Sequence, residues 1–577
     1  MRWHIMLLLT ITAFITAAGF TYHFQDNGIQ SAIVKEKIIL QKKFSFRCSP
    51  LFDPAEADAI PALTGWGNYS WKITTTSDSA QFYFDQGINM YYAFHIIESR
   101  ASFDKATRFD PACAMAYWGK ALAFGPNIND FGYQRPSEAY PSAQKAIELK
   151  AGCSKVEQAL INAMAVRYTA DTTKNQNELN GLYKNAMARV FETYKTNADI
   201  SALYADALMI LHPWDLYNHN YSSKAWTPEI VKVLKHTLTL NPKHPGANHY
   251  YIHAMEASSK PGEALRSADF LSKAMPEVSH ITHMPSHIYI RTGYYNKGIE
   301  QNEKAVNGYQ KYTQHFSPVA EGIALYALHN LHMKMNCAQM AGNYEQSIDA
   351  AKQLQKEIPA FYLSVPGPLG DYVQYIYQSP LFTQIRFGKW DDILKEPVVD
   401  SLAYTKVLQQ FARGIAFAKT NNGAKAAEEL KKLKVSMNAP SLKEPFTPFN
   451  AAYDAAVIAE NILAGTIAEQ HSDYKTAIAF LQKAVQAEDH LIYNEPRDWL
   501  LPARQYLGNV FLKAGKYDEA IAVFKADLAV NPNNGWSLTG LTMAYKNLGK
   551  TPSLAAAQRR LKSAWLIKDV QIRRPVF

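Results

Sequence analysis

Apolar and small residues recur along this chain at the three- and four-residue spacing of helices, and the pattern repeats about every 34 residues. The clearest unit starts at Leu501, where large apolar residues mark one face of each of two successive helices. Small residues stand where those two helices must approach each other. A second unit starts 34 residues later, at Gly535. The pattern predicts an array of helix–turn–helix units.

The unit at Leu501 resembles the tetratricopeptide repeat (TPR), which has 34 residues. The matching residues are Leu507, Gly508, Phe511, Gly515, Tyr517, Ala520, Phe524 and Pro532. Further units start at Ala80, Ala112, Pro245, Ser279 and Leu328, and weaker helix pairs lie near 371–395, 401–434 and 451–487. We therefore expect an all-α fold, an α-solenoid of about ten TPR-like helix pairs.

Other stretches are more specific than the generic repeat. They are CAMAYWGKAL (113–122), GPNIN (125–129), NHYYIHAMEAS (248–258), HITHMPSHIYIRTGYY (280–295), EPRDW (495–499) and NPNNGWSL (531–538). Together they resemble an uncharacterised family of bacterial TPR proteins with a histidine-rich central region. The resemblance implies a TPR scaffold and no particular activity.

The length of 577 residues exceeds the ~250–300 residues that one compact core supports, which agrees with a repeat array. We expect a signal peptide or N-terminal anchor (1–24), a spacer and N-terminal extension (25–78), N-terminal repeats with insertions (79–244), central histidine-rich repeats (245–361), irregular helix pairs with an inserted loop (362–500), and C-terminal repeats with a capping helix (501–577).

The N-terminus favours export. Residues 5–20 form an apolar run behind Arg2, of signal-peptide length and short for a membrane span. We expect an exported protein, periplasmic or extracytoplasmic, or one anchored to the membrane by this segment alone. Export would permit disulfides among Cys48, Cys113, Cys153 and Cys337, although their spacing does not indicate a pairing.

Seven histidines fall on the predicted first helices of three successive units. His249, His253 and the carboxylate Glu256 share one helix face, and His280, His283 and His287 share the next. His329 and His332 lie on the third, followed by Asn336. The TPR resemblance implies that these positions line the concave surface of the solenoid.

Clustered imidazoles favour a transition-metal site, because neutral imidazole is a common ligand for zinc, copper and iron. His249 with His253, and His283 with His287, have the His-x3-His spacing that holds two nitrogens on one side of a metal. The other predicted ligands are Glu256, His280, His329 and His332. Seven histidines exceed one tetrahedral site, so the alternatives are a site with two ions, or one ion whose ligands are hydrogen-bonded by the remaining histidines. The metal would be copper, iron or zinc, and an open position would make the site catalytic.

The alternative is a groove without metal or catalysis that binds a peptide or protein partner, with Arg291 and Asn336 as further groove residues. A net charge of +9 over the whole chain is too dilute to indicate nucleic acid as a partner. Two inserted segments, 212–226 and 488–499, are candidate loops that close the groove.

Overall fold

The computed structural model describes residues 55–577 except 131–132, 317–323 and 447. The predicted signal or anchor segment (1–24) and most of the spacer lie outside these residues, so export stays a prediction. None of the helices in the described residues has both the length and the hydropathy needed to cross a membrane.

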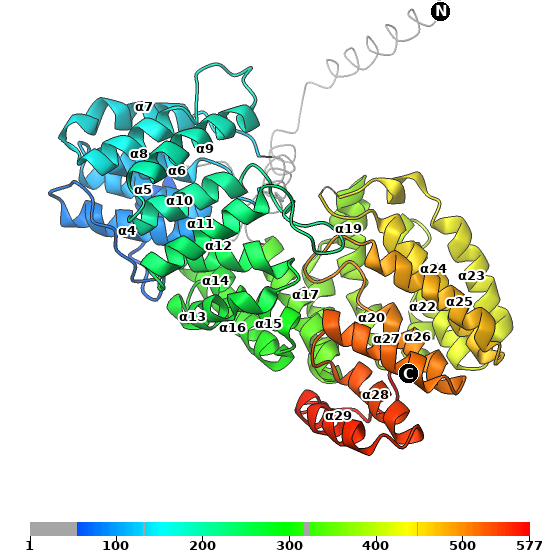
Figure 1. Cartoon of the computed structure of the whole chain (residues 1–577). Coiled ribbons are helices and arrows are strands. Elements are labelled where there is room, and N and C mark those ends of the chain that lie inside the picture. The colour runs from blue at the N-terminus through cyan, green and yellow to red at the C-terminus, as the bar shows by residue number, and fades with distance from the viewer. Residues whose placement is uncertain (1–54, 131–132, 317–323, 447) are drawn as a thin grey trace, which may run out of the picture. The chain divides into compact units, whose positions relative to one another are not determined.

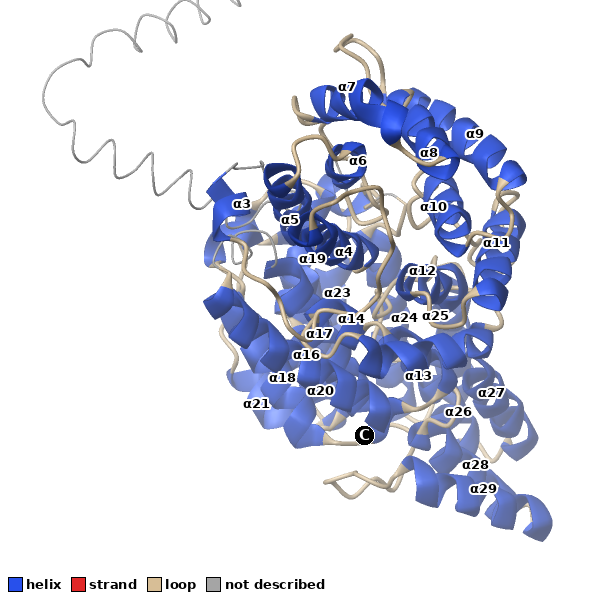
Figure 2. Cartoon of the chain, turned by 90° about the vertical axis from the view of Figure 1, so that its left-hand side faces the viewer, coloured by secondary structure: helices blue, strands red, loops and turns tan. Residues whose placement is uncertain are grey.

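The described part of the chain is built from helices (Figures 1 and 2) and contains no strand, only two isolated bridges. The helices are α3 (Ala55–Ala59), α4 (Asp78–Tyr92), α5 (Ile96–Phe109), α6 (Ala114–Ala123), α7 (Ala139–Leu149), α8 (Lys155–Ala165), α9 (Gln176–Thr193), α10 (Ala198–Met209), α11 (Thr227–Leu240), α12 (Pro245–Glu256), α13 (Leu265–Ala274), α14 (Ser279–His283), α15 (Pro285–Thr292), α16 (Tyr295–His315), α17 (Ala324–Ala341), α18 (Tyr344–Glu357), α19 (Pro368–Tyr377), α20 (Ser379–Arg386), α21 (Trp390–Lys395), α22 (Ala403–Lys419), α23 (Gly423–Ser436), α24 (Ala452–Gln470), α25 (Tyr474–Asp489), α26 (Ala503–Lys513), α27 (Tyr517–Val530), α28 (Gly535–Asn547) and α29 (Thr551–Ala564).

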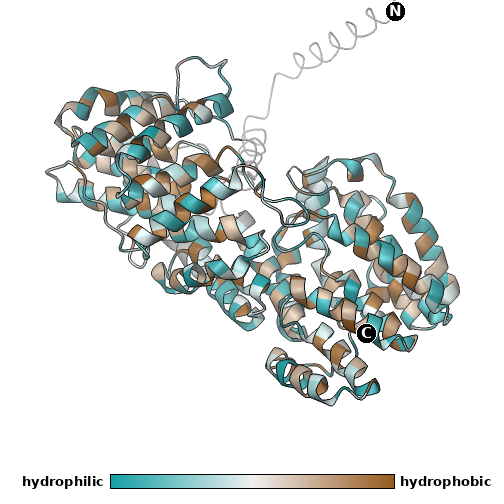
Figure 3. Ribbon diagram, viewed as in Figure 1, coloured by the Kyte–Doolittle hydropathy of each residue, from teal (hydrophilic) through white to brown (hydrophobic). Residues whose placement is uncertain are grey.

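Successive helices pack against each other as the repeat predicts, for example α4 with α5, α24 with α25, and α26 with α27. Apolar and polar residues alternate around these helices (Figure 3), so each buries one face. Gly508 on α26 shows why a small residue is needed at the crossing: a Cβ there would lie 2.4 Å from the ring of Phe524. The all-α, TPR-like solenoid is confirmed.

Local breaks distinguish the structure from the regular prediction. The helix expected from Ser279 is divided into α14 and α15 at Pro285, because proline has no N–H to continue the helical hydrogen bonds. The weak pair near 371–395 consists of three short helices, α19, α20 and α21. Cys113, Cys153 and Cys337 are free thiols, so the predicted option of disulfides among these three is wrong, and Cys48 lies outside the described residues.

Candidate metal centre

Helix α12 supplies the first part of the centre. His249, His253 and Glu256 are spaced four and three residues apart, which places them on one helix face. The helix is buried over its whole length, and the three side chains belong to residues that are 0%, 4% and 0% exposed. Gly246 allows this burial, because a Cβ there would lie 2.4 Å from the ring of Tyr92 on α4.

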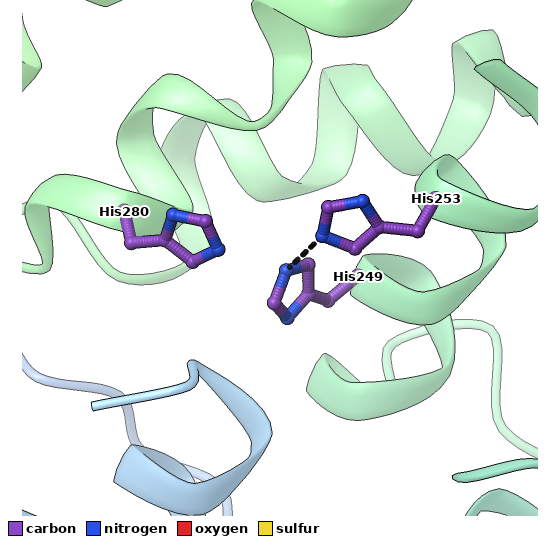
Figure 4. A group of neighbouring side chains, drawn as sticks. All are labelled: His249, His253 and His280. Carbon is purple, nitrogen blue, oxygen red and sulfur yellow. Dashed lines mark hydrogen bonds between the residues drawn. The ribbon is translucent and has the colours of Figure 1, made fainter. Parts of the chain in front are cut away.

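A first set of three imidazoles is formed by His249, His253 and His280, which we call set A (Figure 4). The Nε2 atoms of His249 and His253 are 3.1 Å apart. His280 comes from α14 and points toward this pair, and neither of its ring nitrogens has a hydrogen-bond partner in the described residues. One nitrogen from each histidine lies within 4.8 Å of the other two.

A second set, set B, is formed by His283, His287 and His329. The Nε2 atoms of His283 and His287 are 2.5 Å apart, and the ring of His329 on α17 lies 4.6 Å from that of His283. His283 and His287 are buried, whereas 20% of the His329 side chain is exposed. Sets A and B adjoin, since the rings of His253 and His287 are 5.8 Å apart.

One buried carboxylate joins the two sets. Oε1 of Glu256 accepts a hydrogen bond from Nδ1 of His253 at 2.9 Å, and Oε2 accepts one from Nδ1 of His287 at 2.7 Å. Histidines that bind metals commonly donate their second ring nitrogen in this way. Glu256 therefore lies behind both histidines and directs their Nε2 atoms toward the other members of the sets.

These hydrogen bonds determine where the protons are in set A. Nδ1 of His249 must be protonated, because its partner at 2.7 Å is the backbone carbonyl of Tyr92, which only accepts. Nδ1 of His253 is protonated for the same reason, opposite Glu256. In neutral imidazoles both Nε2 atoms then carry lone pairs. Two lone pairs then face each other across 3.1 Å, and a metal ion or a shared proton would satisfy both.

The same reasoning applies to set B. Nδ1 of His283 contacts Oδ1 of Asn302 at 2.6 Å, and the amide nitrogen of Asn302 is oriented by donating to the carbonyl of Gly298. Nδ1 of His283 is therefore the donor, and its Nε2 is unprotonated, as is Nε2 of His287 opposite Glu256. The lone pairs on Nε2 of His283 and Nε2 of His287 therefore also face each other, across 2.5 Å.

Burial keeps these imidazoles neutral. It lowers the pKa of His249 to about 3, of His253 to about 4 and of His287 to about 3, from an ordinary value near 6.5. Burial also lowers the pKa values of His280 and His283. The neutral form is the one that binds metals.

A second carboxylate, Glu495, reaches the centre from the inserted loop 488–499. Its Oε2 contacts Nδ1 of His287, and its Oε1 lies 4.0 Å from Nε2 of His329. Asn494 and Glu495 line the same cavity as the histidines. Sequence reasoning identified the loop as a closing segment but did not select Glu495. The acidic residue within EPRDW was the available signal.

Three aromatic residues in the described part of the chain adopt left-handed backbone conformations, which are rare for bulky side chains. Two of them lie against the histidines of set A. They are Phe94, with φ 59°, and Trp214, with φ 61°. The Phe94 ring lies 4.5 Å from that of His249, and Trp214 lies 5.2 Å from His253. Such conformations cost about 1–3 kcal/mol and tend to occur at functional sites. Trp214 belongs to the inserted segment 212–226, which the sequence suggested as a closing loop.

The remaining predicted residues lie outside sets A and B. His332 is buried on α17 beside Tyr375, with a ring distance of 5.4 Å. Asn336 is buried further along α17. Arg291 donates to three backbone carbonyls, those of Glu256, Ser258 and Val530, so its guanidinium group holds the surrounding backbone together.

A cavity of about 250 Å³ adjoins the two sets. One side is formed by histidines of α12, α14, α15 and α17 together with Glu495. The lining also includes apolar and aromatic residues, among them Trp214, Tyr372, Phe446 and Phe449. A cluster of potential ligands beside a largely apolar cavity is the usual arrangement of a small-molecule site.

No protein-family model matches the chain, and no curated protein matches it. The chain is similar to the solved structures of the human IFIT1 dimer with m7Gppp-AAAA (14% identity, 92% of this chain and 100% of that chain, TM-score 0.30), the APC/C hetero-tetramer Cut9-Hcn1 (12%, 84% and 90%, TM-score 0.27) and the yeast Tom70 (11%, 84% and 93%, TM-score 0.28). These are TPR-type helical repeat proteins. At such identities and TM-scores, no ligand or partner is transferred to this chain.

Proposed function

We propose that this protein is a metalloprotein whose centre holds two transition-metal ions, one in set A and one in set B. The observation that carries the proposal is the pair of facing lone pairs in each set. Hydrogen bonds to the Tyr92 carbonyl, to Glu256 and to Asn302 fix the protons on Nδ1 and leave four Nε2 atoms directed at one another. A metal ion in each set satisfies these nitrogens.

The ligand chemistry favours copper, iron or zinc. Imidazole nitrogen suits these ions, whereas magnesium and calcium prefer oxygen. Three imidazoles in each set also resemble catalytic rather than structural sites, because a fourth position stays open for water or substrate. With the cavity beside both sets, this open coordination supports a catalytic centre.

The alternative of a peptide-binding groove would use these histidines on an accessible concave surface. Six of the seven are 0–4% exposed as residues, and Arg291 is already bonded to backbone carbonyls. These features favour a buried small-molecule centre at this place. Binding of a peptide or protein partner stays a prediction.

The test is elemental analysis of the full chain, purified without a polyhistidine tag or chelator. The variants are His249→Ala for set A, His283→Ala for set B, and the pair combined. We expect two equivalents of metal in the parent, about one in each single variant and none in the double variant. The control is His236→Ala, since His236 is half-buried outside the two sets and its Nε2 contacts the Lys195 carbonyl. A parent that binds no metal after reconstitution would overturn the proposal.

A further inference from the structure

The cavity beside the histidines has two chemically different walls. The histidine wall comes from α12, α14, α15 and α17, and the aromatic wall comes from α19, from the loop before α24 and from the segment 212–226. An engineered apolar cavity of 150 Å³ holds benzene. A cavity of about 250 Å³ therefore has room for one aromatic ring and a substituent.

The rings of the aromatic wall contact each other. Phe446 stacks on Tyr372 at 5.5 Å with the ring planes 10° apart, and on Phe449 at 6.1 Å. Phe449 lies 6.0 Å from Trp214, whose indole Nε1 donates to Oδ1 of Asn129 at 3.1 Å. This hydrogen bond fixes the position of the Trp214 indole ring. Aromatic walls of this kind favour a ring, because offset and edge contacts add to the burial of area.

The imidazole of His332 lies in the cavity lining and belongs to neither set A nor set B. His332 lines the cavity and is 2% exposed, and neither of its ring nitrogens has a hydrogen-bond partner in the described residues. A buried polar group without a partner loses about 1–3 kcal/mol. Neutral imidazole can accept one hydrogen bond and donate one. A ligand with a hydroxyl or amine group would supply the missing partner.

We propose that the cavity binds a small neutral aromatic molecule with one hydrogen-bonding substituent, whose hydroxyl or amine group bonds to His332 while its ring lies against the aromatic wall. A neutral molecule is proposed because the aromatic residues that its ring would contact do not compensate a buried charge. The idea that this molecule is the substrate of the metal centre rests on the proposed function. The binding of the molecule to His332 is independent of the proposed function.

The test compares three probes of similar size by calorimetry: phenol, toluene, which lacks the hydroxyl group, and cyclohexanol, which lacks the aromatic ring. Each is titrated into the full chain with zinc and without metal. We expect phenol to bind about three- to tenfold more tightly than toluene in the parent, as one hydrogen bond provides. In His332→Leu this advantage should disappear while the metal content stays at the parent level. Cyclohexanol should bind more weakly than phenol in both.

Each outcome decides the inference separately from the metal proposal. Phenol selectivity that depends on His332 in a chain without metal sustains the inference even when the metal centre fails. Equal affinities for phenol and toluene, or a phenol advantage that His332→Leu retains, overturn it. Should His332→Leu not fold, Phe449→Leu tests the aromatic wall. It should reduce the preference for phenol over cyclohexanol, and an unchanged preference would refute the ring placement.

Discussion

Glu256 allows the proposed centre to be tested without removing a ligand. In Glu256→Gln one acceptor oxygen becomes an NH2 donor, so the side chain can accept from His253 or His287 but not from both. The histidine that loses its acceptor no longer has its proton held on Nδ1. Its Nε2 is then partly protonated and unavailable to a metal.

The loss of metal affinity expected in Glu256→Gln depends on Glu495, because Glu495 also contacts Nδ1 of His287. In Glu256→Gln, Glu495 can still hold the His287 proton, so we expect a loss near the lower end of the roughly 10–100-fold range for such partners. Glu495→Gln alone should have a smaller effect, because Glu256 remains. In the double variant His287 has no carboxylate, and the ion of set B should bind about 100-fold more weakly, roughly 2.7 kcal/mol.

The assay is competition with a chelating chromophore at pH 7.5, which measures the affinity of each ion in the four proteins of this double-mutant cycle. The expected signature is non-additivity, with the double variant losing more than the two single effects combined. Glu469→Gln is the control, since Glu469 is also buried and is paired with Lys419 and Lys513. Additive losses, or wild-type affinities in the double variant, would refute the role given to the two carboxylates.

Three further predictions concern stability. Gly246→Ala should destabilise the fold by about 1–3 kcal/mol in urea titrations, because its Cβ would lie 2.4 Å from Tyr92. The control is Gly308→Ala on α16, whose Cβ meets nothing within 4 Å, so that this variant should be neutral or stabilising. Equal effects of the two variants would contradict this packing. Lowering the pH should destabilise the metal-free chain, because burial lowers the pKa of His249 and His287 to about 3. Below pH ~6.5 the unfolded chain therefore takes up protons that the folded chain excludes. By pH 5.5 the free energy of unfolding should fall by roughly 1 kcal/mol per histidine. Urea midpoints between pH 5 and 8 measure this, and a flat profile would oppose it. Metal at about 100 times its Kd should add about 2.7 kcal/mol per ion, reversed by a chelator; an unchanged melting temperature would count against the centre.

Local pattern was sufficient to predict the helices and the pairing of α26 with α27, because an amphipathic face and a small crossing residue are properties of neighbouring residues. It was also sufficient for the two His-x3-His pairs, since residues four apart share a helix face whatever surrounds the helix. The break at Pro285 could have been predicted on the same local basis, from the missing N–H.

Tertiary packing decided how the histidines are divided. His280 shares its sequence neighbourhood with His283 and His287, yet it joins His249 and His253, whereas His329 completes the other set. No spacing rule determines that division, because it depends on how α12, α14 and α17 are placed against each other.

The hydrogen-bond partners of the histidines also could not be predicted from the sequence. The Tyr92 carbonyl, which fixes the tautomer of His249, lies 157 positions away along the chain, and Glu495 lies beyond α25. A backbone carbonyl has no residue-type signature, and the approach of distant loops reflects the packing of the whole solenoid. The sequence determined which groups capable of binding a metal are present and on which helix faces they lie. Packing alone decided which of their nitrogens face one another.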